Sequence, residues 1–587
     1  SIVNSGSGAG SEDMGASYID VADDNTTWDY ANNVTFPFGY GLSYTSFSFE
    51  MSDVSIEFED RHEVKASFDV TVTNTGNVAG KTPVQIYAQS PYTDYDKRHG
   101  VEKSAIQLMT FEKTKKLDPN ESQTIHFDVD LQELASYDYK TAKTYIMEEG
   151  TYYFAVGNGA HDALNNVLAA QGKTTADGMD ANGTAALAKA WTYDSATDNA
   201  ADDFSFAQSK AGVEITNQLK YADWNDYAPG TVTYLTRNDW DGTWPRTYTN
   251  MAAPDLMVKH YNGKVIDYGT KDNPDSQAEL DAVLFDQESP EGYKFGHMVG
   301  AAFDDYRWEE LINQISLDEA ILFAIESGRG FAAIDSINFP EGRYAENGPG
   351  TPIWYDANSS EPQAPWKVEE PQDNEHNLGS FPTFSVIAST FSRELAYEYG
   401  RVLGNDSIFG EKPILWLPGA NLHRTAYAGR SEQYFSENPI LTGIITMEAA
   451  YGAWQKGAIV TAKHFAFNDQ EMHRSGVGTF QTEQRAREME LRGFQIAFEA
   501  NKYNEPIEGE RDFSGGMQGV MTSFSKLGGI ECTVNEGLLS GILRGEWGYH
   551  GYIVSDLKDD LDLMPQAFLA GLGGYDWRTF EQDVQPY

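Results

Sequence analysis

From about residue 291 onward, amphipathic helical stretches alternate with short apolar runs, and this alternation constrains the fold more than any other feature. Helical periodicity is clear in WEELINQISLDEAILFAIES and ILTGIITMEAAYGAWQKG, whereas ILWLPG, AIVTAKHFA, GVMTSFS and GYIVSD have the character of buried strands. Helices alternating with buried strands indicate a parallel sheet, and at least four such repeats predict a barrel or a doubly wound sheet.

The first half of the chain has a different pattern. Between about residues 46 and 160, segments such as VKASFDVTVTNTGNVAGKTPVQIYAQSPY alternate apolar and polar residues and break at turns, which predicts an immunoglobulin-like β-sandwich. Residues 1–45 are too short for a domain. Residues 161–290 are interrupted by Gly and loop-like stretches, and we interpret them as an extended connector.

The charge balance restricts the partners. With 89 acidic and 42 basic side chains the formal net charge is −47, so nucleic acid or an anionic membrane would be repelled at long range. A neutral ligand fits better. The many Tyr, Phe and Trp residues suit stacking on sugars, although composition alone favours the simpler role of filling cores. Cys532 is the one cysteine, which excludes an intrachain disulfide.

The ends of the sequence carry little information on location. No run approaches the ~18 apolar residues of a membrane-spanning helix, and SIVNSGSGAGSEDMG lacks the pattern of a signal peptide. It also lacks an initiating Met, so we treat the chain as a fragment or a processed piece. The compartment stays open, with a cytoplasmic or cell-associated location in a bacterium favoured.

Polar residues gather where the strands predicted after residue 291 end. Arg424 follows ILWLPG, Lys463 and His464 lie in AIVTAKHFA, Ser523 ends GVMTSFS, and Asp556 follows GYIVS. The C-terminal ends of parallel strands share one rim, so we expect these side chains to meet there. Because several cations cannot be buried without partners, the site must hold carboxylates or an oxygen-rich ligand such as a sugar.

Asp556 is the candidate nucleophile. A strand-held carboxylate near cationic donors is expected to have a lowered pKa and to stay ionised. Beside a sugar it would act as the nucleophile of a retaining glycosidase, provided that a second carboxyl lies about 5 Å away. The structural alternative is a helix cap or a salt-bridge partner, and Asp559 and Asp560 are rival positions.

The other charged residues also have structural interpretations. A strand-end lysine such as Lys463 is usually solvated, and a lone histidine such as His464 is usually satisfied inside a core. His464 has no Cys or His at metal-ligand spacing, so zinc is not expected. Arg424 and Arg430 could equally brace strands. Helical spacing predicts a salt-bridged helix face, rather than a site, for Glu483, Arg485, Arg487 and Glu488.

Several ordered motifs resemble one known family. FPFGYGLSYTSF and VTNTGNVAGKTPVQIYAQSPY resemble the start of the fibronectin-III-like domain, and the segment before it, in family 3 glycoside hydrolases, the β-glucosidase family. LPGANLHRTAYAGRSEQYFSENPILTG, KHFAFNDQE, EQRARE, GVMTSFSKLGG and LLSGILRGEWGYHGYIVSD resemble its barrel domain. The common arrangement puts the barrel first, so the order here resembles the circularly permuted branch.

The resemblance implies a multi-domain chain that combines α/β and all-β parts. Residues 1–45 would be the C-terminal remnant of an α/β sandwich domain, and 46–160 a fibronectin-III-like β-sandwich. Residues 161–290 would be the connector, and 291–587 a TIM-like (β/α) barrel that carries the catalytic site, whole or truncated.

The family's functional residues carry over to matching positions. Asp556 in VSD matches the nucleophile that forms the glycosyl-enzyme intermediate. Lys463 and His464 match a pair that binds sugar hydroxyls in the −1 subsite, and Arg424 in NLHR matches an arginine that does likewise. KHFAFNDQE lacks the KHFPGHG signature of the N-acetylglucosaminidase branch, which favours a glucosidase-like specificity.

Several positions depart from the family pattern. Asn347 in ENGPG stands where the family has an Asp that grips two sugar hydroxyls, and an uncharged amide should bind them more weakly. Phe524 replaces a frequent Tyr and Leu557 a frequent Trp. Phe524 and Met521 complete the expected substrate-binding set. The family's acid/base Glu precedes PFGYG, and only about 35 residues do so here, so this residue is not expected in the chain.

The sequence therefore predicts an exo-acting β-glycosidase of β-glucosidase type that acts on an oligosaccharide or β-glucoside with retention and needs no cofactor or metal. The oligomeric state stays open, with a homodimer as one option. The alternative is a degenerate, non-catalytic sugar-binding relative without the acid/base. A purely structural adhesion-like protein explains residues 46–160 but leaves the polar strand ends without a role.

Overall fold

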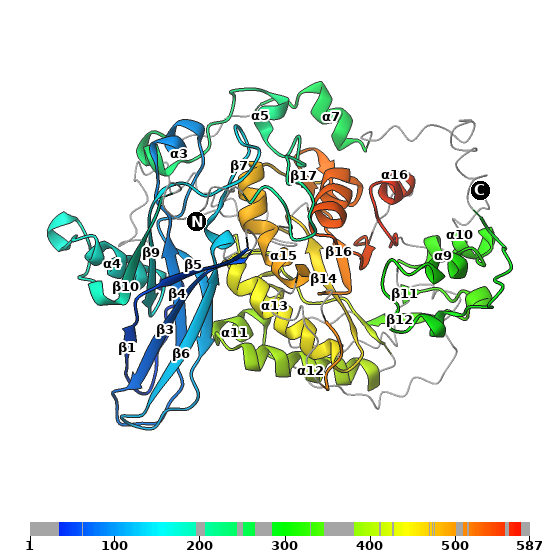
Figure 1. The fold of residues 1–587 in the computed structure, drawn as a ribbon. Coiled ribbons are helices and arrows are strands. Elements are labelled where there is room, and N and C mark those ends of the chain that lie inside the picture. Colours follow the sequence, from blue (N-terminus) through cyan, green and yellow to red (C-terminus); the bar gives the residue numbers. More distant parts are fainter. Residues whose placement is uncertain are drawn as a thin grey trace.

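The structure is a computed structural model, and its parts follow one another along the chain. Figure 1 shows a β-sandwich, a connector that crosses the top of the view, and an α/β part. Asn347, Asp559 and Asp560 lie outside the described residues, which are 34–60, 63–194, 206–243, 251–263, 284–328, 330–345, 381–409, 412–424, 428–468, 470–471, 474, 476–499, 509–513, 516–557 and 563–576.

Two antiparallel sheets form the sandwich. The first contains β1 (Phe47–Met51), β2 (Ser55–Asp60), β3 (Glu63–Asn74) and β6 (Ser122–Asp130), and the other three strands all pair with β3. The second has the order β10 (Ala188–Tyr193), β9 (Gly150–Gly157), β4 (Pro83–Gln89) and β5 (Gln107–Lys113). Alternate residues of β3 are buried against the second sheet in one apolar core. The period-two pattern thus predicted this part correctly.

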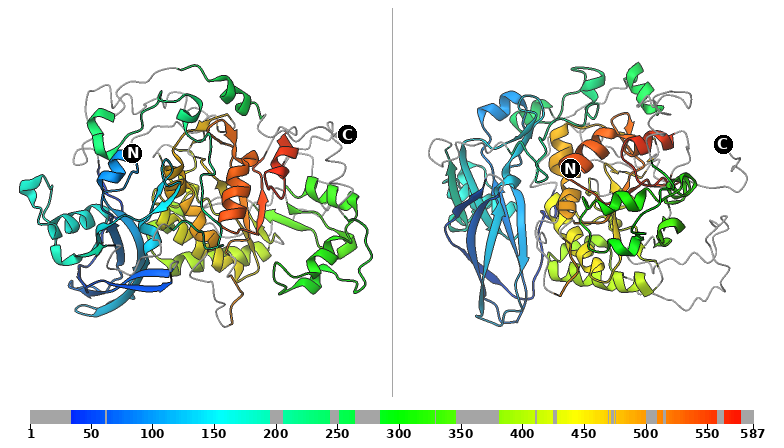
Figure 2. Two further views of the ribbon diagram at one scale, coloured as in Figure 1. Left: turned by 45° about the horizontal axis from the view of Figure 1, so that its top comes forward. Right: turned by 45° about the vertical axis from the view of Figure 1, so that its right-hand side comes forward.

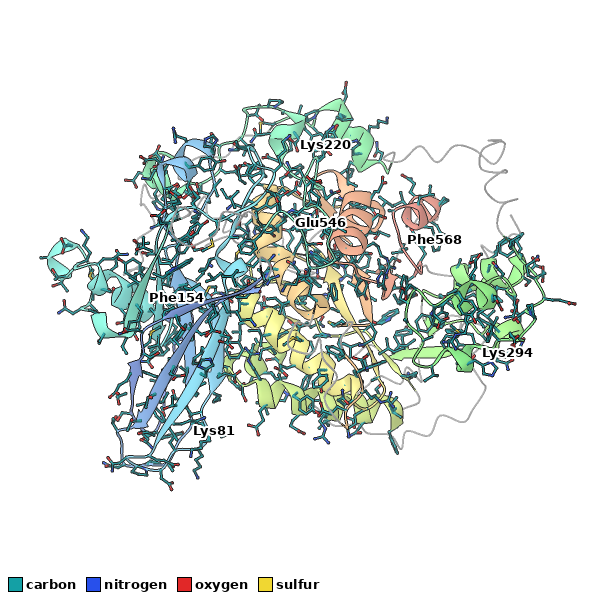
Figure 3. The ribbon with its side chains drawn as sticks, in the orientation of Figure 1. Lys81, Phe154, Lys220, Lys294, Glu546 and Phe568 are labelled. Carbon is teal, nitrogen blue, oxygen red and sulfur yellow. The ribbon has the colours of Figure 1, made fainter. Side chains whose placement is uncertain are left out.

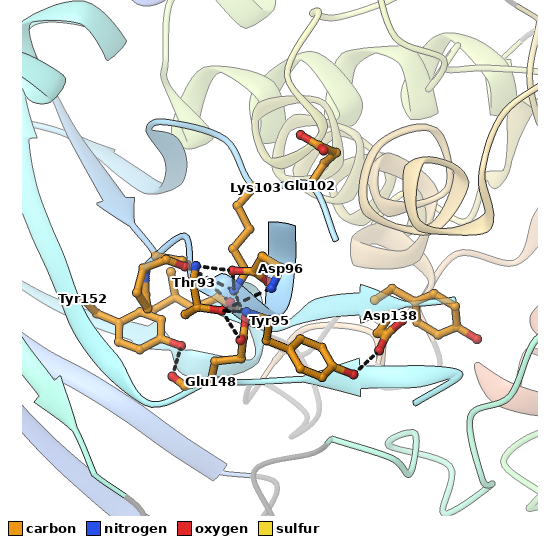
Figure 4. A network of polar contacts seen from close by, with 12 residues as sticks. Thr93, Tyr95, Asp96, Glu102, Lys103, Asp138, Glu148 and Tyr152 are labelled. Atoms are coloured by element: carbon orange, nitrogen blue, oxygen red, sulfur yellow. Dashed lines mark hydrogen bonds and ion pairs between the residues drawn. The ribbon is translucent and has the colours of Figure 1, made fainter. Parts of the chain in front are cut away.

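A loop between β4 and β5 is fixed by a buried lysine. The loop carries α3 (Asp94–His99), and Lys103 Nζ lies 3.0 Å from Asp96 and 2.5 Å from Glu148 (Figure 4). These ion pairs hold the loop against the segment that precedes β9. The neighbouring Glu102 accepts a 3.0 Å hydrogen bond from the Arg237 amide, so the anchored loop also holds the connector.

The first part of the predicted connector belongs to the sandwich. α4 (Ala160–Ala170) follows β9, and β10 then pairs antiparallel with β9, so the sandwich extends to Tyr193. The remaining connector contains α5 (Trp224–Tyr227), α6 (Trp240–Thr243) and α7 (Asp255–Tyr261). Figures 1 and 2 show that α5 and α7 lie over the α/β part.

The α/β part is built on a six-stranded sheet. Its order is β11 (Gly330–Phe331), β12 (Gly342–Ala345), β13 (Ile414–Leu415), β14 (Ile459–Phe465), β16 (Gly519–Thr522) and β19 (Tyr552–Val554). β11 pairs antiparallel with β12 and every later pairing is parallel, as the alternating pattern predicted. Apolar side chains from all six strands meet in one cluster that contains Phe331, Tyr344, Ile414, Trp416, Ile459, Met521, Tyr552 and Val554.

Helices surround this sheet. They are α9 (Arg307–Ile312), α10 (Leu317–Glu326), α11 (Phe384–Ser389), α12 (Arg393–Phe409), α13 (Pro439–Trp454), α14 (Glu483–Arg485), α15 (Arg492–Glu499) and α16 (Met564–Leu569). π-helical turns cover Ala486–Glu490 and Gly537–Glu546. Small sheets pair β7 (Ser136–Asp138) with β8 (Thr144–Ile146), and β17 (Lys526–Leu527) with both β15 (Gly478–Thr479) and β18 (Ile530–Glu531). None of the described helices is long and apolar enough to cross a bilayer.

α13 lies between the sandwich and the sheet. Asn438 caps it through the Leu441 amide at 3.0 Å, and Pro439 occupies its first turn, where no amide donor is needed. Its sequence PILTGIITMEAAYGAW is apolar on every side, and Pro439 to Ala453 are all buried. The helix therefore needs partners on every side to keep it from water.

Polar contacts tie the sandwich to the α/β part. The Arg393 guanidinium donates to the Phe111 carbonyl at 3.1 Å, and Lys113 donates to the Thr390 carbonyl at 2.6 Å. Apolar residues of both parts, among them Phe111 and Phe391, share one core. Figure 3 shows Phe154 inside the sandwich and Glu546 inside the α/β part, on the two sides of this joint.

Candidate functional site

The ends of three neighbouring strands bring the candidate residues together. Lys463 and His464 lie on β14, and Asp556 follows β19, where its amide donates to the Thr522 carbonyl at the end of β16 at 3.2 Å. His464 Nε2 lies 3.5 Å from Asp556 Oδ2. The predicted rim therefore exists for these residues, and Lys463 and His464 are only 3% and 2% exposed.

The two carboxylate oxygens of Asp556 differ in their hydrogen bonds. Oδ1 accepts a 2.8 Å hydrogen bond from the Leu557 amide, whereas Oδ2 is buried and has no hydrogen-bond partner among the described residues. Burial raises the pKa of this carboxyl above its ordinary value, and the positive charges of Lys463 and Arg430 oppose the rise without cancelling it. The predicted lowering of the pKa is therefore wrong, because desolvation outweighs the cations.

His464 is a neutral imidazole. Burial, together with the charges of Arg430 and Lys463, moves its pKa well below the ordinary value. Arg430 Nη1 lies 3.0 Å from Nε2, so the ring can accept that hydrogen bond, and Tyr434 Oη lies 3.2 Å from Nδ1. The Asn421 side chain accepts from the His464 amide at 2.6 Å and donates to its carbonyl at 2.8 Å. The ring is thus fixed from both sides.

Glu471 links two arginines close to His464. Glu471 accepts from Arg430 Nε at 3.1 Å and from Arg474 Nη1 at 2.7 Å, and the Asn468 amide donates to it at 2.9 Å. The carboxylate fixes both guanidinium groups close enough to Asp556 to oppose the rise of its pKa. The site is therefore rich in donors that could bind the hydroxyls of a neutral ligand.

The residues after β16 have separate roles. The Phe524 ring is half-buried, with the Arg474 guanidinium 4.2 Å from its centre, so Phe524 lies beside the site. Met521 is 1% exposed and packs in the apolar cluster between the strands. Ser523 donates to the Ala466 carbonyl at 2.6 Å and so braces the loop after β14.

Arg424 lies elsewhere. Its Nη1 is 3.8 Å from Glu490, and it lines a cavity of about 390 Å³ between α11 and the segment around Phe38, whose lining contains neither Asp556 nor Lys463. The structure thus brings Arg430, not Arg424, to the nucleophile candidate. Both arginines follow β13, and strand-end position alone does not say which of them points inward.

Arg474 and Tyr434 were not predicted at all. Their one sequence signal is their position on the loops that carry KHFAFNDQE and AGRSEQYF. The helix face predicted from Glu483 and Arg487 is confirmed as an ion pair of 2.9 Å, but it is buried rather than solvated. Within the described ranges, no group of three or more His, Cys, Asp or Glu side chains could hold a metal ion.

The fold and the site combine an α/β part, joined to a β-sandwich, with a buried carboxylate oxygen that has no hydrogen-bond partner among the described residues and lies among basic side chains. Residues 372–564 match the Glycosyl hydrolase family 3 N terminal domain, and residues 82–160 match the Fibronectin type III-like domain. The two matches lie in the order that the motifs predicted, with the fibronectin-III-like segment before the segment that resembles family 3 glycosyl hydrolases.

Known proteins resemble the chain over most of its length. A β-glucosidase of Ruminococcus albus is 27% identical over 546 residues, which are 89% of this chain and 46% of the relative. β-Glucosidase A of Butyrivibrio fibrisolvens is 26% identical over 550 residues, 89% of this chain and 56% of the relative. The chain therefore spans about half the length of these relatives.

A solved structure has the same fold. The crystal structure of a β-glucosidase from Paenibacillus barengoltzii superposes with a TM-score of 0.61 at 23% identity, covering 96% of this chain and 54% of that chain. The superposition extends over the sandwich, the connector and the α/β part together. The arrangement of these parts is thus shared with a β-glucosidase.

Proposed function

We propose that the chain carries the sugar-binding and nucleophile-bearing part of a β-glycosidase of β-glucosidase type, which hydrolyses a terminal β-linked sugar with retention. The observation that carries this proposal is the Asp556 carboxylate, whose Oδ2 is buried, has no hydrogen-bond partner among the described residues and lies 3.5 Å from His464. A carboxylate oxygen that nothing else uses is available to attack a sugar carbon.

The surrounding residues have distinct parts in this mechanism. Lys463 and Arg430 would donate hydrogen bonds to sugar hydroxyls, and neutral His464, whose Nε2 can accept from Arg430, would help to keep that guanidinium in place. A bound sugar would screen Asp556 from water while these cations stabilise its charge. The raised pKa makes Asp556 easier to protonate, so the attack requires a pH above the pKa of this carboxyl.

The second carboxyl of a retaining pair is a separate question. Among the described residues of the cluster, Glu471 is held by two arginines and by Asn468, an arrangement suited to keep the arginines in place rather than to release a proton. Glycosidases of this type place the acid/base about 5 Å from the nucleophile. We propose that this group comes from residues beyond those around Asp556, as the family resemblance implies.

The domain architecture also belongs to the proposal. The fibronectin-III-like match precedes the family 3 match, and the alignments to both bacterial relatives run through both regions in this order. A circularly permuted arrangement accounts for this order. The six-stranded sheet, whose strands share one apolar cluster, supports a TIM-like barrel as the complete form of the α/β part.

A trapping experiment tests the nucleophile. The chain is incubated with an activated 2-fluoro-β-glucoside, and peptide mass spectrometry locates any covalent label; an activated leaving group needs little acid catalysis, so no acid/base is required. We expect a label on Asp556, none in Asp556→Asn, and an unchanged label in Asp560→Asn. An unlabelled wild-type chain that still binds glucose would instead identify a non-catalytic sugar-binding relative.

A further inference from the structure

The loops after β14 and β16 contact each other at several points. They pair through β15 and β17, where the Lys526 amide donates to the Val477 carbonyl at 3.0 Å. Closer to the site, the Arg474 guanidinium of the first loop lies 4.2 Å from the centre of the Phe524 ring of the second. The place of Arg474 beside Asp556 therefore depends on how these two loops are held.

The connector holds both loops. Its Ala222 carbonyl accepts from the Gln481 amide at 3.0 Å, just after β15. At the end of α7, the Tyr261 hydroxyl donates to the Gly476 carbonyl, close to Arg474 in the chain. The Tyr261 ring also faces the second loop, because Lys526 Nζ lies 4.7 Å from its centre. One tyrosine thus contacts both loops.

α7 is itself firmly seated. His260 is 8% exposed, and its Nδ1 lies 2.8 Å from Tyr227 Oη on α5. Below it, a Cβ on Gly529 would lie only 2.9 Å from the same hydroxyl and 3.3 Å from the Met257 carbonyl, so this glycine permits the close approach. Tyr261 therefore contacts the two loops from a fixed support.

We propose that Tyr261 is a positioning residue of the site: its hydrogen bond to Gly476 and its contact with Lys526 keep Arg474 stacked on Phe524 and directed at Asp556. The inference deepens the proposed function and rests on it, because it gives the connector a role at the same site. Nothing in the motifs around Lys463 or Asp556 points to the connector.

The charged side chains around Asp556 and Tyr261 indicate which cation a change at Tyr261 should displace. Asp556 is faced by Lys463, His464, Arg430 and Arg474, and Glu471 stands behind the two arginines. Lys526 is paired with Glu531 at 2.6 Å, so the charge nearest Tyr261 is already balanced. Among the described residues, Arg474 is the cationic side chain nearest to Gly476 along the chain, so it is the cation that loss of the Tyr261–Gly476 hydrogen bond should displace. Its displacement should weaken the field that favours the ionised form of Asp556.

The test measures the pKa of Asp556 directly in the whole chain. Protein with ¹³C-labelled Asp carboxyls is titrated by NMR, and Asp556→Asn assigns the resonance. In Tyr261→Phe, which removes only the hydroxyl, we expect the pKa of Asp556 to rise by about 0.5 unit, and Tyr261→Leu should give at least the same rise. The control is Tyr44→Phe, since Tyr44 is 100% exposed.

Each outcome is decisive. A rise in both Tyr261 variants with an unchanged Tyr44→Phe supports the inference, and the acid limb of 2-fluoroglucoside labelling should then move to higher pH by the same amount. An unchanged titration in Tyr261→Phe would overturn it, as would a labelling rate that falls equally at every pH. The titration needs no turnover, so an unlabelled wild-type chain would count against the proposed function alone.

Discussion

Two buried charge clusters in the α/β part differ in one respect. Around Arg487, the guanidinium donates to Glu483 at 2.9 Å, to both oxygens of Glu546 at 2.6 and 3.1 Å, and to the Thr216 carbonyl at 2.8 Å. Glu483 also accepts from connector amides, including that of Gln218 at 2.8 Å. Around Asp556, by contrast, one carboxylate oxygen has no hydrogen-bond partner among the described residues.

The difference distinguishes a cluster that the fold tolerates from a cluster suited to a functional role. In the Arg487 cluster the buried charges are matched by partners, as buried ions must be if the fold is to tolerate them. In the Asp556 cluster, the buried oxygen Oδ2 has cations nearby but no hydrogen-bond partner among the described residues. This arrangement destabilises the native state but leaves the oxygen available to a ligand. Only the second arrangement is what a catalytic carboxylate requires.

Removing the cation of the Arg487 cluster should have the largest effect on stability. Arg487→Met leaves Glu483 and Glu546 buried without their cation, so we expect the free energy of unfolding to fall by about 3–5 kcal/mol. Urea unfolding measures this. The matched control is Arg401→Met, which removes an exposed pair with Glu398 and should cost at most about 1 kcal/mol. Equal losses in the two variants would contradict the comparison.

A pH titration of stability should give the next largest effect. Glu488 accepts a 2.6 Å hydrogen bond from the Tyr137 amide, but burial raises its pKa to about 7. Because the folded pKa is raised, its contribution is fully present near pH 4 and is lost as the pH rises through about 7. Glu488→Gln should match the wild type near pH 4 and exceed it by up to about 3 kcal/mol at pH 9.

The outcome that contradicts this prediction is a constant difference between Glu488→Gln and the wild type from pH 5 to 9. Such a result would mean that Glu488 stays ionised in the folded protein over this whole range. Parallel urea unfolding curves at each pH provide the measurement.

Neutralising Asp556 in the second cluster should have the smallest effect on stability. Burial raises the pKa of Asp556, so its ionised form destabilises the fold at neutral pH. Asp556→Asn should therefore increase the free energy of unfolding at pH 7, by about 0.5–2 kcal/mol, while abolishing the covalent label. The gain should disappear below about pH 3, where Asp556 is protonated in both states. A loss of stability at pH 7 would show that Asp556 is a structural residue.

Periodicity predicted the fold better than it predicted the site. The alternation in β3 and the apolar runs of β14, β16 and β19 identify strands because each pattern follows from which faces are buried. β10 was missed because its sequence AKAWTY follows a Gly-interrupted stretch, and its pairing with β9 is a long-range contact. The apolar runs of β13, β14, β16 and β19 likewise predict parallel pairing but not closure of the sheet into a barrel.

Side-chain direction explains what was missed at the site. Asp556, Lys463 and His464 lie on or next to regular strands, so their place follows from the strand ends. Arg424 and Arg430 lie on one irregular loop, where no periodicity says which guanidinium points inward. The sign of the Asp556 pKa shift also depends on burial, and the number of cations nearby does not determine it.

Helix α13 makes the sandwich and the α/β part interdependent. Most of its surface packs on α12, α15 and β14 of the α/β part, and it also contacts β5 of the sandwich, so separating the two parts would expose apolar surface of α13. We therefore expect the two parts to unfold together rather than one after the other. Limited proteolysis should accordingly yield no stable fragment that retains Pro439–Trp454 without the sandwich.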